Sequence, residues 1–243
     1  MPYRRLPKTD LSRIKAIQKA VSMEGYKENG QLVLSYQTIR DAQQLLSKFR
    51  SAQRQYQQYH DLFLSANKGY REEERTARMY VSHFIQVLNM TIQRGELRSD
   101  IKAGYGLDPS SNSLPPLSTD EDLANWGVKV IEGEEKRIQQ GGAPIYNPNI
   151  AKVKVHFSIF AERFYSISNY KHNFEKFRNE LLQMRPMVDD LLLDLWNQVE
   201  AFYAECPLSE RIEKGNQFGL IYYLRDTEKK QVEAEKLQSR LEF

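Results

Sequence analysis

The chain has 243 residues and a formal net charge of +3, with 40% hydrophobic and 28% charged residues. This length is enough to bury the core of one large domain or two small ones. Apolar runs such as Leu191 to Leu193 are far shorter than the roughly 20 residues that cross a bilayer, so we expect no membrane partner. Residues 1–7 contain no apolar leader, and the single cysteine, Cys206, cannot form an internal disulfide, so we predict a cytoplasmic protein.

The charges are unevenly distributed. Residues 1–20 carry six basic side chains and one acidic side chain, whereas residues 107–135 carry seven acidic side chains and one basic side chain. This asymmetry could steer a partner or an intramolecular contact. We prefer the simpler interpretation of two solvated faces, because charge blocks of this size are common on helical proteins.

A first helix is predicted from the Thr9/Asp10 cap to about Ala20. Its predicted apolar stripe consists of Leu11, Ile14, Ile17 and Val21. Residues 31–35 lack helical spacing and are interpreted as a brief extended segment.

A heptad pattern predicts a long helical unit over residues 36–95. Its seam consists of Ala42, Leu45, Phe49, Ala52, Tyr56, Tyr59, Phe63 and Ala66, and continues through Tyr70, Ala77, Tyr80, Phe84, Val87 and Thr91. Asn67-Lys68-Gly69 is compatible with a turn and an antiparallel hairpin. Because the heptad phase is the same on both sides of these residues, we favour a continuous helix.

A second helical unit is predicted over residues 150–206, with a weaker heptad seam. The seam includes Phe157, Phe160, Phe164, Phe174, Leu181, Val188, Leu192, Leu195 and Val199. Pro186 lies inside this unit, where it must kink a continuous helix or begin a new one.

The segment between the two units, residues 96–149, differs in composition. Residues 104–116 are rich in Gly, Ser, Asn and Pro and predict a loop. A capping box at Thr119 and the Gly141-Gly142 pair predict a helix between them. After the second helical unit, residues 218–224 have a strand-like composition that could pair with residues 31–35, and the charged tail from Arg225 is expected to fray.

These elements predict a mainly all-α fold with two long, antiparallel, heptad-patterned helical units, either as a coiled-coil-like pair or as a four-helix bundle. The fold includes a central loop and helix insertion and allows one small two-stranded β element. We predict one elongated helical domain over residues 1–243. Its predicted sub-regions are 1–35, 36–95, 96–149, 150–206 and 207–243.

Four stretches of the chain resemble a family of bacterial hypothetical proteins. They are MPYRRLP at 1–7, SHFIQVLNM at 82–90, WGVKVIEGE at 126–134 and GGAPIYNP at 141–148. The similarity covers most of the chain. The family has no assigned activity, so the resemblance implies neither a ligand nor a catalytic residue.

Standard catalytic and binding motifs are missing from the sequence. We find no phosphate-binding glycine loop, no zinc-type spacing and no nucleophile elbow. The acidic residues Glu132, Glu134 and Glu135 are interpreted as a solvated helix face, because spacing alone does not show that carboxylates converge. We therefore predict no catalytic residue, no cofactor and no metal site.

The function that we rank first is a non-enzymatic interaction or scaffold module whose partner is another protein or a second copy. We place recognition in residues 96–149, with Tyr105, Trp126, Tyr146 and Asn147 as contacts, because loops this long are usually functional or disordered. In the competing interpretation the segment only caps the helices. Nucleic-acid binding through the basic arm with Tyr3 ranks second, and an enzyme that uses residues 96–149 ranks third.

Overall fold

The computed structural model describes residues 2–241, so Met1 and residues 242–243 of the predicted arm and tail lie outside the described part. The chain packs as two compact units. Unit 1 contains residues up to 58 and residues from 174 onward, and unit 2 contains residues 59–173. The helices α2 (Tyr36–Ala66) and α5 (Ile150–Phe202) contribute residues to both units, so the single-domain assignment stays a prediction.

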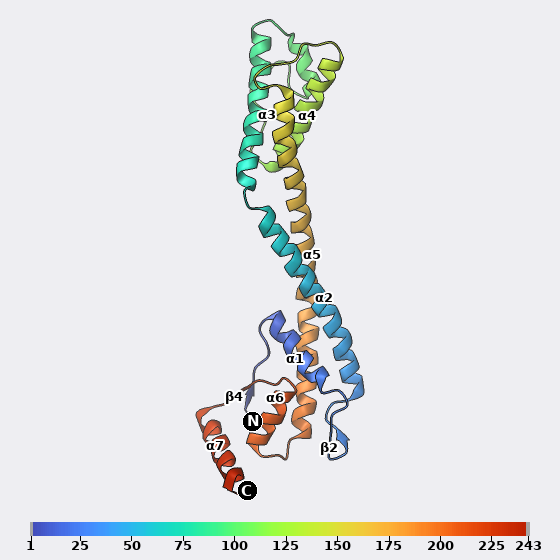
Figure 1. Ribbon diagram of the computed structural model, residues 1–243, viewed down its shortest axis with the longest axis vertical. Coiled ribbons are helices and arrows are strands. Elements are labelled where there is room, and N and C mark those ends of the chain that lie inside the picture. The colour runs from blue at the N-terminus through green and yellow to red at the C-terminus, as the bar shows by residue number, and fades with distance from the viewer. Residues whose placement is uncertain (1, 242–243) are drawn as a thin grey trace. The chain divides into compact units, whose positions relative to one another are not determined.

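The core of unit 1 forms between three helices. The first half of α2 runs antiparallel to the second half of α5, and α1 (Asp10–Ser22) packs against both (Figure 1). The buried side chains come from all three helices and include Ile14, Ile17, Ile39, Ala42, Phe49, Leu181, Val188, Leu192 and Trp196. The predicted mainly α-helical fold with antiparallel long helices is confirmed.

α1 begins as predicted, with a capping box between Thr9 and Ser12. Its buried face includes Ile14 and Ile17, but Leu11 is exposed, so the predicted stripe is wrong at that position. The reason is that the small residues Ala16 and Ala20 share the buried face with Ile14 and Ile17, which turns that face away from Leu11. On the α5 side, the Arg13 guanidinium donates from Nε and Nη2 to the two carboxylate oxygens of Asp189, at 2.8 Å each.

Two short antiparallel ribbons lie in unit 1. β1 (Tyr3–Arg4) pairs with β4 (Tyr222–Tyr223), and β2 (Lys27–Glu28) pairs with β3 (Gln31–Leu32). The predicted pairing of residues 31–35 with residues 218–224 is therefore wrong. Asn29 and Gly30 both have positive φ, at 51° and 79°, and Asn-Gly is the preferred tight turn of a local hairpin.

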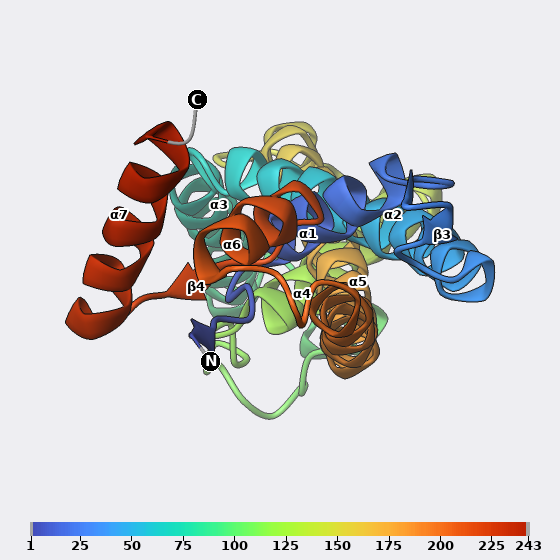
Figure 2. The same ribbon diagram turned by 90° about the horizontal axis from the view of Figure 1, so that it is seen from below.

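The C-terminal region is helical rather than frayed over its described residues. α6 (Leu208–Gln217) was not predicted, and α7 (Asp226–Leu241) occupies the predicted charged tail. The two helices lie next to each other in unit 1 (Figure 2). The Glu235 carboxylate of α7 accepts a 2.7 Å hydrogen bond from the Ser209 amide in the first turn of α6, which anchors the tail.

In unit 2, α2 ends at Ala66 and α3 (Tyr70–Gln93) begins after Gly69, whose φ is 76°. The preferred continuous helix is therefore wrong, because this left-handed residue interrupts it. The end of α2 leads into α3 without folding back, so there is no hairpin either (Figure 1).

Unit 2 is completed by η1 (Ser99–Tyr105), α4 (Asp120–Gln139) and the first half of α5. α4 has the predicted capping box at Thr119 and ends just before Gly141. Gly127 lets α4 approach α5 closely, because a Cβ there would lie 2.0 Å from the Phe157 ring. The helix α5 continues through Pro186, so no new helix begins at that proline.

Candidate functional site

The four predicted contact residues lie in different environments in unit 2. Tyr105 is buried, Trp126 is half-buried with Lys129 Nζ 4.5 Å from its ring centroid, and Tyr146 and Asn147 are exposed. The structure therefore separates Tyr105, in the interior, from Tyr146 and Asn147, on the surface. Their role in recognition stays a prediction.

A buried carboxylate explains the position of Tyr105. The Glu134 side chain is 0% exposed and accepts hydrogen bonds from the Tyr105 hydroxyl at 2.5 Å, from Arg137 at 2.8 Å and from the Ile145 amide at 3.0 Å. Burial alone would raise the pKa of Glu134, but the three donors hold that pKa below its ordinary value. Glu134 is thus the anchor of segment 96–149 and not part of the predicted solvated face.

A second buried group holds the loop of the same segment. Lys102 Nζ donates to the Ser111 carbonyl oxygen at 2.9 Å and to Asn112 Oδ1 at 2.7 Å, and Asn89 Nδ2 of α3 donates to the Asn112 carbonyl oxygen at 3.1 Å. A buried lysine is stable only with such partners. These bonds fix the loop against α3, as a structural cap requires.

Signs of reactive chemistry are few in the described residues. No group of three or more His, Cys, Asp or Glu side chains there could hold a metal ion. Burial, with smaller contributions from Glu210 and Glu28, raises the pKa of Cys206, so this thiol stays protonated at neutral pH and is a weak nucleophile. Among the described helices, we find no apolar stretch that could span a lipid bilayer.

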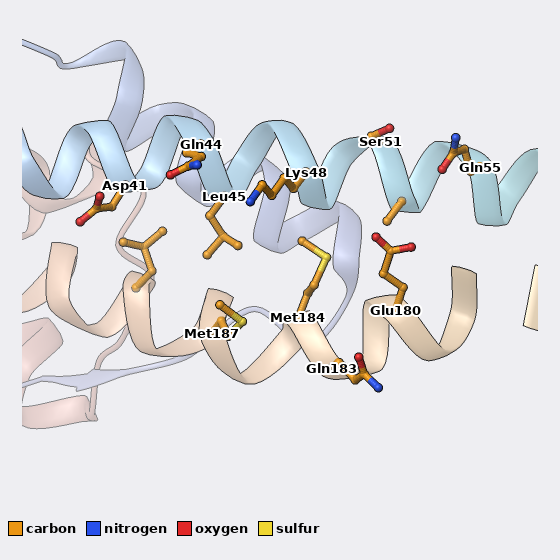
Figure 3. Close-up of a pocket in the computed structure, with 12 residues that line it drawn as sticks. Asp41, Gln44, Leu45, Lys48, Ser51, Gln55, Glu180, Gln183, Met184 and Met187 are labelled. Atoms are coloured by element: carbon orange, nitrogen blue, oxygen red, sulfur yellow. The ribbon is translucent and has the colours of Figure 1, made fainter. Parts of the chain in front are cut away.

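A groove of about 720 Å³ lies between α2 and α5 in unit 1 (Figure 3). Its apolar lining consists of Leu45 and Ala52 from α2 and Met184, Met187 and Leu191 from α5. Leu45, Met184 and Leu191 also pack against the core of unit 1 and are only partly buried, while Met187 is 58% exposed. The core therefore covers one side of these side chains and leaves the other side open.

The rim of the groove is polar. Figure 3 shows Asp41 toward one end of the groove, Glu180 toward the other and Lys48 between them. None of the three forms an ion pair with another described residue, although Asp41 accepts a hydrogen bond from Gln37. The remaining rim residues are Gln44, Ser51, Gln55 and Gln183.

This groove was not predicted from the sequence. The lining positions on α2 are 41, 44, 45, 48, 51, 52 and 55, and those on α5 are 180, 183, 184, 187 and 191. Both sets follow the three-and-four spacing of a second stripe beside the buried seam. This spacing, together with Met184 and Met187 beside Pro186, is the sequence feature that could have indicated the groove.

No family model, no curated protein sequence and no solved structure matches this chain. The resemblance to a bacterial family therefore stays an expectation.

Proposed function

We propose that this protein is an interaction module that binds an amphipathic helix of another protein in the α2–α5 groove of unit 1. The observation that carries the proposal is the half-covered apolar lining of this groove. α1 fills one side of the α2–α5 pair, and a second helix placed in the groove would fill the other side and complete a four-helix arrangement.

The groove has dimensions that suit a helix. Its lining extends from Asp41 to Gln55 on α2, and at 1.5 Å per residue this is about 21 Å, or about four helical turns. Met184 and Met187 add adaptable contact surface, because the unbranched thioether side chain fits irregular partners. A peptide that binds by strand addition would need an exposed sheet edge for its backbone hydrogen bonds, and two helices do not provide one.

The charges on the rim specify the partner further. Asp41 and Glu180 lie toward opposite ends of the groove and Lys48 lies between them. The complementary helix therefore carries an apolar stripe with basic residues near both ends and an acidic residue near its centre. We also propose that the protein acts in the cytoplasm, on the basis of its single cysteine.

Fluorescence anisotropy with a designed peptide tests this function. The probe is a labelled helical peptide of about 18 residues, or five turns, with leucines at three-and-four spacing, lysines at both ends and a central glutamate. We expect it to bind, and we expect Met187→Glu to weaken binding at least about tenfold, because the new carboxylate lies against the apolar stripe. Met79→Glu, at an exposed methionine of α3 in unit 2, is the matched control.

Two control peptides test whether binding depends on the charges of the peptide and on its apolar stripe. A peptide with its lysines and glutamate exchanged, and a peptide with the same composition but no stripe, should both bind more weakly. If the designed peptide does not bind, or binds Met187→Glu as well as the wild type, the groove is not a helix site. If the protein self-associates and Met187→Glu abolishes that association, the occupant is a second copy, which contradicts a heterologous partner.

A further inference from the structure

The β1–β4 ribbon of unit 1 has one covered face and one open face. Tyr3 is the cross-strand partner of Tyr223, and the Arg5 amide donates to the Ile221 carbonyl oxygen at 3.0 Å. Because side chains alternate along a strand, Tyr3, Arg5, Ile221 and Tyr223 share one face. Tyr3 is 68% and Tyr223 50% exposed.

The opposite face of the ribbon is occupied by protein contacts. Arg4 pairs with Glu200 at 3.2 Å and donates to Asn197 at 2.8 Å, both on α5. Its cross-strand partner Tyr222 is half-buried, and a Cβ at Gly215 would clash with its ring. The ribbon is therefore fixed on unit 1 with its two exposed tyrosines side by side.

Two positively charged side chains lie next to these tyrosines. The Arg5 guanidinium lies 5.1 Å from the centre of the Tyr223 ring and donates to its hydroxyl. Lys8 is exposed and has no ion-pair partner among the described residues. Both cations line a hollow of about 580 Å³ whose other lining residues are Tyr3, Leu6, Pro7, Arg13 and Tyr223.

The carboxylates next to this hollow are already neutralised. Asp189 pairs with Arg13 at 2.8 Å, and Asp10 pairs with Arg185 at 2.7 Å. The charges of Arg5 and Lys8 are therefore not balanced by acids bonded to the hollow, and an anion is the complementary ligand.

We propose that this ribbon binds single-stranded nucleic acid. Bases stack on Tyr3 and Tyr223, and backbone phosphates contact Arg5 and Lys8. Aromatic side chains on adjacent strands with nearby cations suit unstacked bases, whereas the bases of a duplex present only their edges. A proline-rich peptide would use the tyrosines but would leave both cations without a partner. The site shares no lining residue with the α2–α5 groove, so it is independent of the proposed function.

Fluorescence anisotropy with labelled oligo(dT) and oligo(U) at low salt tests the proposal. We expect both to bind, and we expect each of Tyr3→Ala and Tyr223→Ala to weaken binding about tenfold through lost stacking. Tyr3→Phe should bind like the wild type, because it keeps the ring. Lys8→Ala should make the plot of log affinity against log salt concentration shallower, by the amount expected for the loss of about one phosphate contact. Tyr36→Ala, at an exposed tyrosine of α2, is the control.

Three outcomes overturn the proposal. The first is no binding of either oligonucleotide at low salt. The second is equal binding by the wild type and the Tyr3→Ala/Tyr223→Ala double variant, or equal competition by duplex DNA, since either means attraction by charge without stacking. The third is tyrosine-dependent binding of a proline-rich peptide without any binding of oligonucleotides.

Discussion

The long helices are covered to different extents in the two units. In unit 2, α4 and the segment around η1 cover α3 and α5, and the buried groups Glu134 and Lys102 find their partners inside the unit. In unit 1, α1 covers only one side of the α2–α5 pair, and Leu45, Met184 and Met187 remain partly exposed. The same heptad pattern is thus covered from within the chain in unit 2 and left partly uncovered between α2 and α5 in unit 1.

The largest expected effect comes from removing the buried carboxylate of unit 2. Glu134→Ala leaves Arg137, whose side chain is only 10% exposed, without its charge partner, and should lower the free energy of unfolding by about 3 to 5 kcal/mol. Glu135→Ala is the control, because its ion pair with Lys154 is solvent-exposed and should matter by less than about 0.5 kcal/mol. Denaturant unfolding measures both. Equal stabilities for the two variants would refute an anchoring role of Glu134.

The same carboxylate predicts a pH dependence. The pKa of Glu134 in the folded protein lies below its ordinary value of 4.5, so ionised Glu134 stabilises the fold above that value. This stabilisation is lost as the pH falls through the lowered pKa. The stability difference between wild type and Glu134→Ala should therefore be largest near neutral pH and shrink as the pH falls below 4.5. A difference that does not change with pH would mean that the carboxylate charge is not involved.

An intermediate effect is expected at the close contact of α4 with α5. Gly127→Ala would normally favour a helix, but here the new Cβ overlaps the Phe157 ring, so we expect a loss of about 1 to 3 kcal/mol. Gly104→Ala is the control, since no atom lies within 4 Å of its Cβ position. Thermal melts compare the two variants, and a stabilised Gly127→Ala protein would show that the helices separate there at no cost.

The smallest effect is expected at the groove of unit 1. Met187 is exposed and its side chain is not needed to fill the core, so Met187→Gln should change the free energy of unfolding by less than about 0.5 kcal/mol. A substantially lower melting temperature would show that Met187 supports the fold, and the groove would then be part of the core of unit 1.

Local signals in the sequence predicted much of this architecture. The Thr119 capping box and Gly141 gave the ends of α4, and the heptad seam placed Phe49 and Phe84 in the core. Asn29-Gly30 is an equally local turn signal, but the hairpin that it forms was not predicted. α7 was missed because its anchor, the Glu235 contact with α6, joins residues 26 positions apart.

The groove could not be predicted for a different reason. A wide apolar stripe on a helix shows that something covers it, but not whether the cover comes from the same chain. Leu45 was assigned to the predicted seam, yet it contacts the core on one side and lines the groove on the other. Only the position of α1 shows which side of the α2–α5 pair remains open.

Hydrogen–deuterium exchange with and without the designed peptide tests the central claim most directly. We predict slower amide exchange in residues 41–55 and 180–191 when the peptide is bound, and unchanged exchange in α4 and in residues 141–149. Protection confined to residues 96–149 would instead support recognition by Tyr146 and Asn147, and would contradict the assignment of the groove as the binding site.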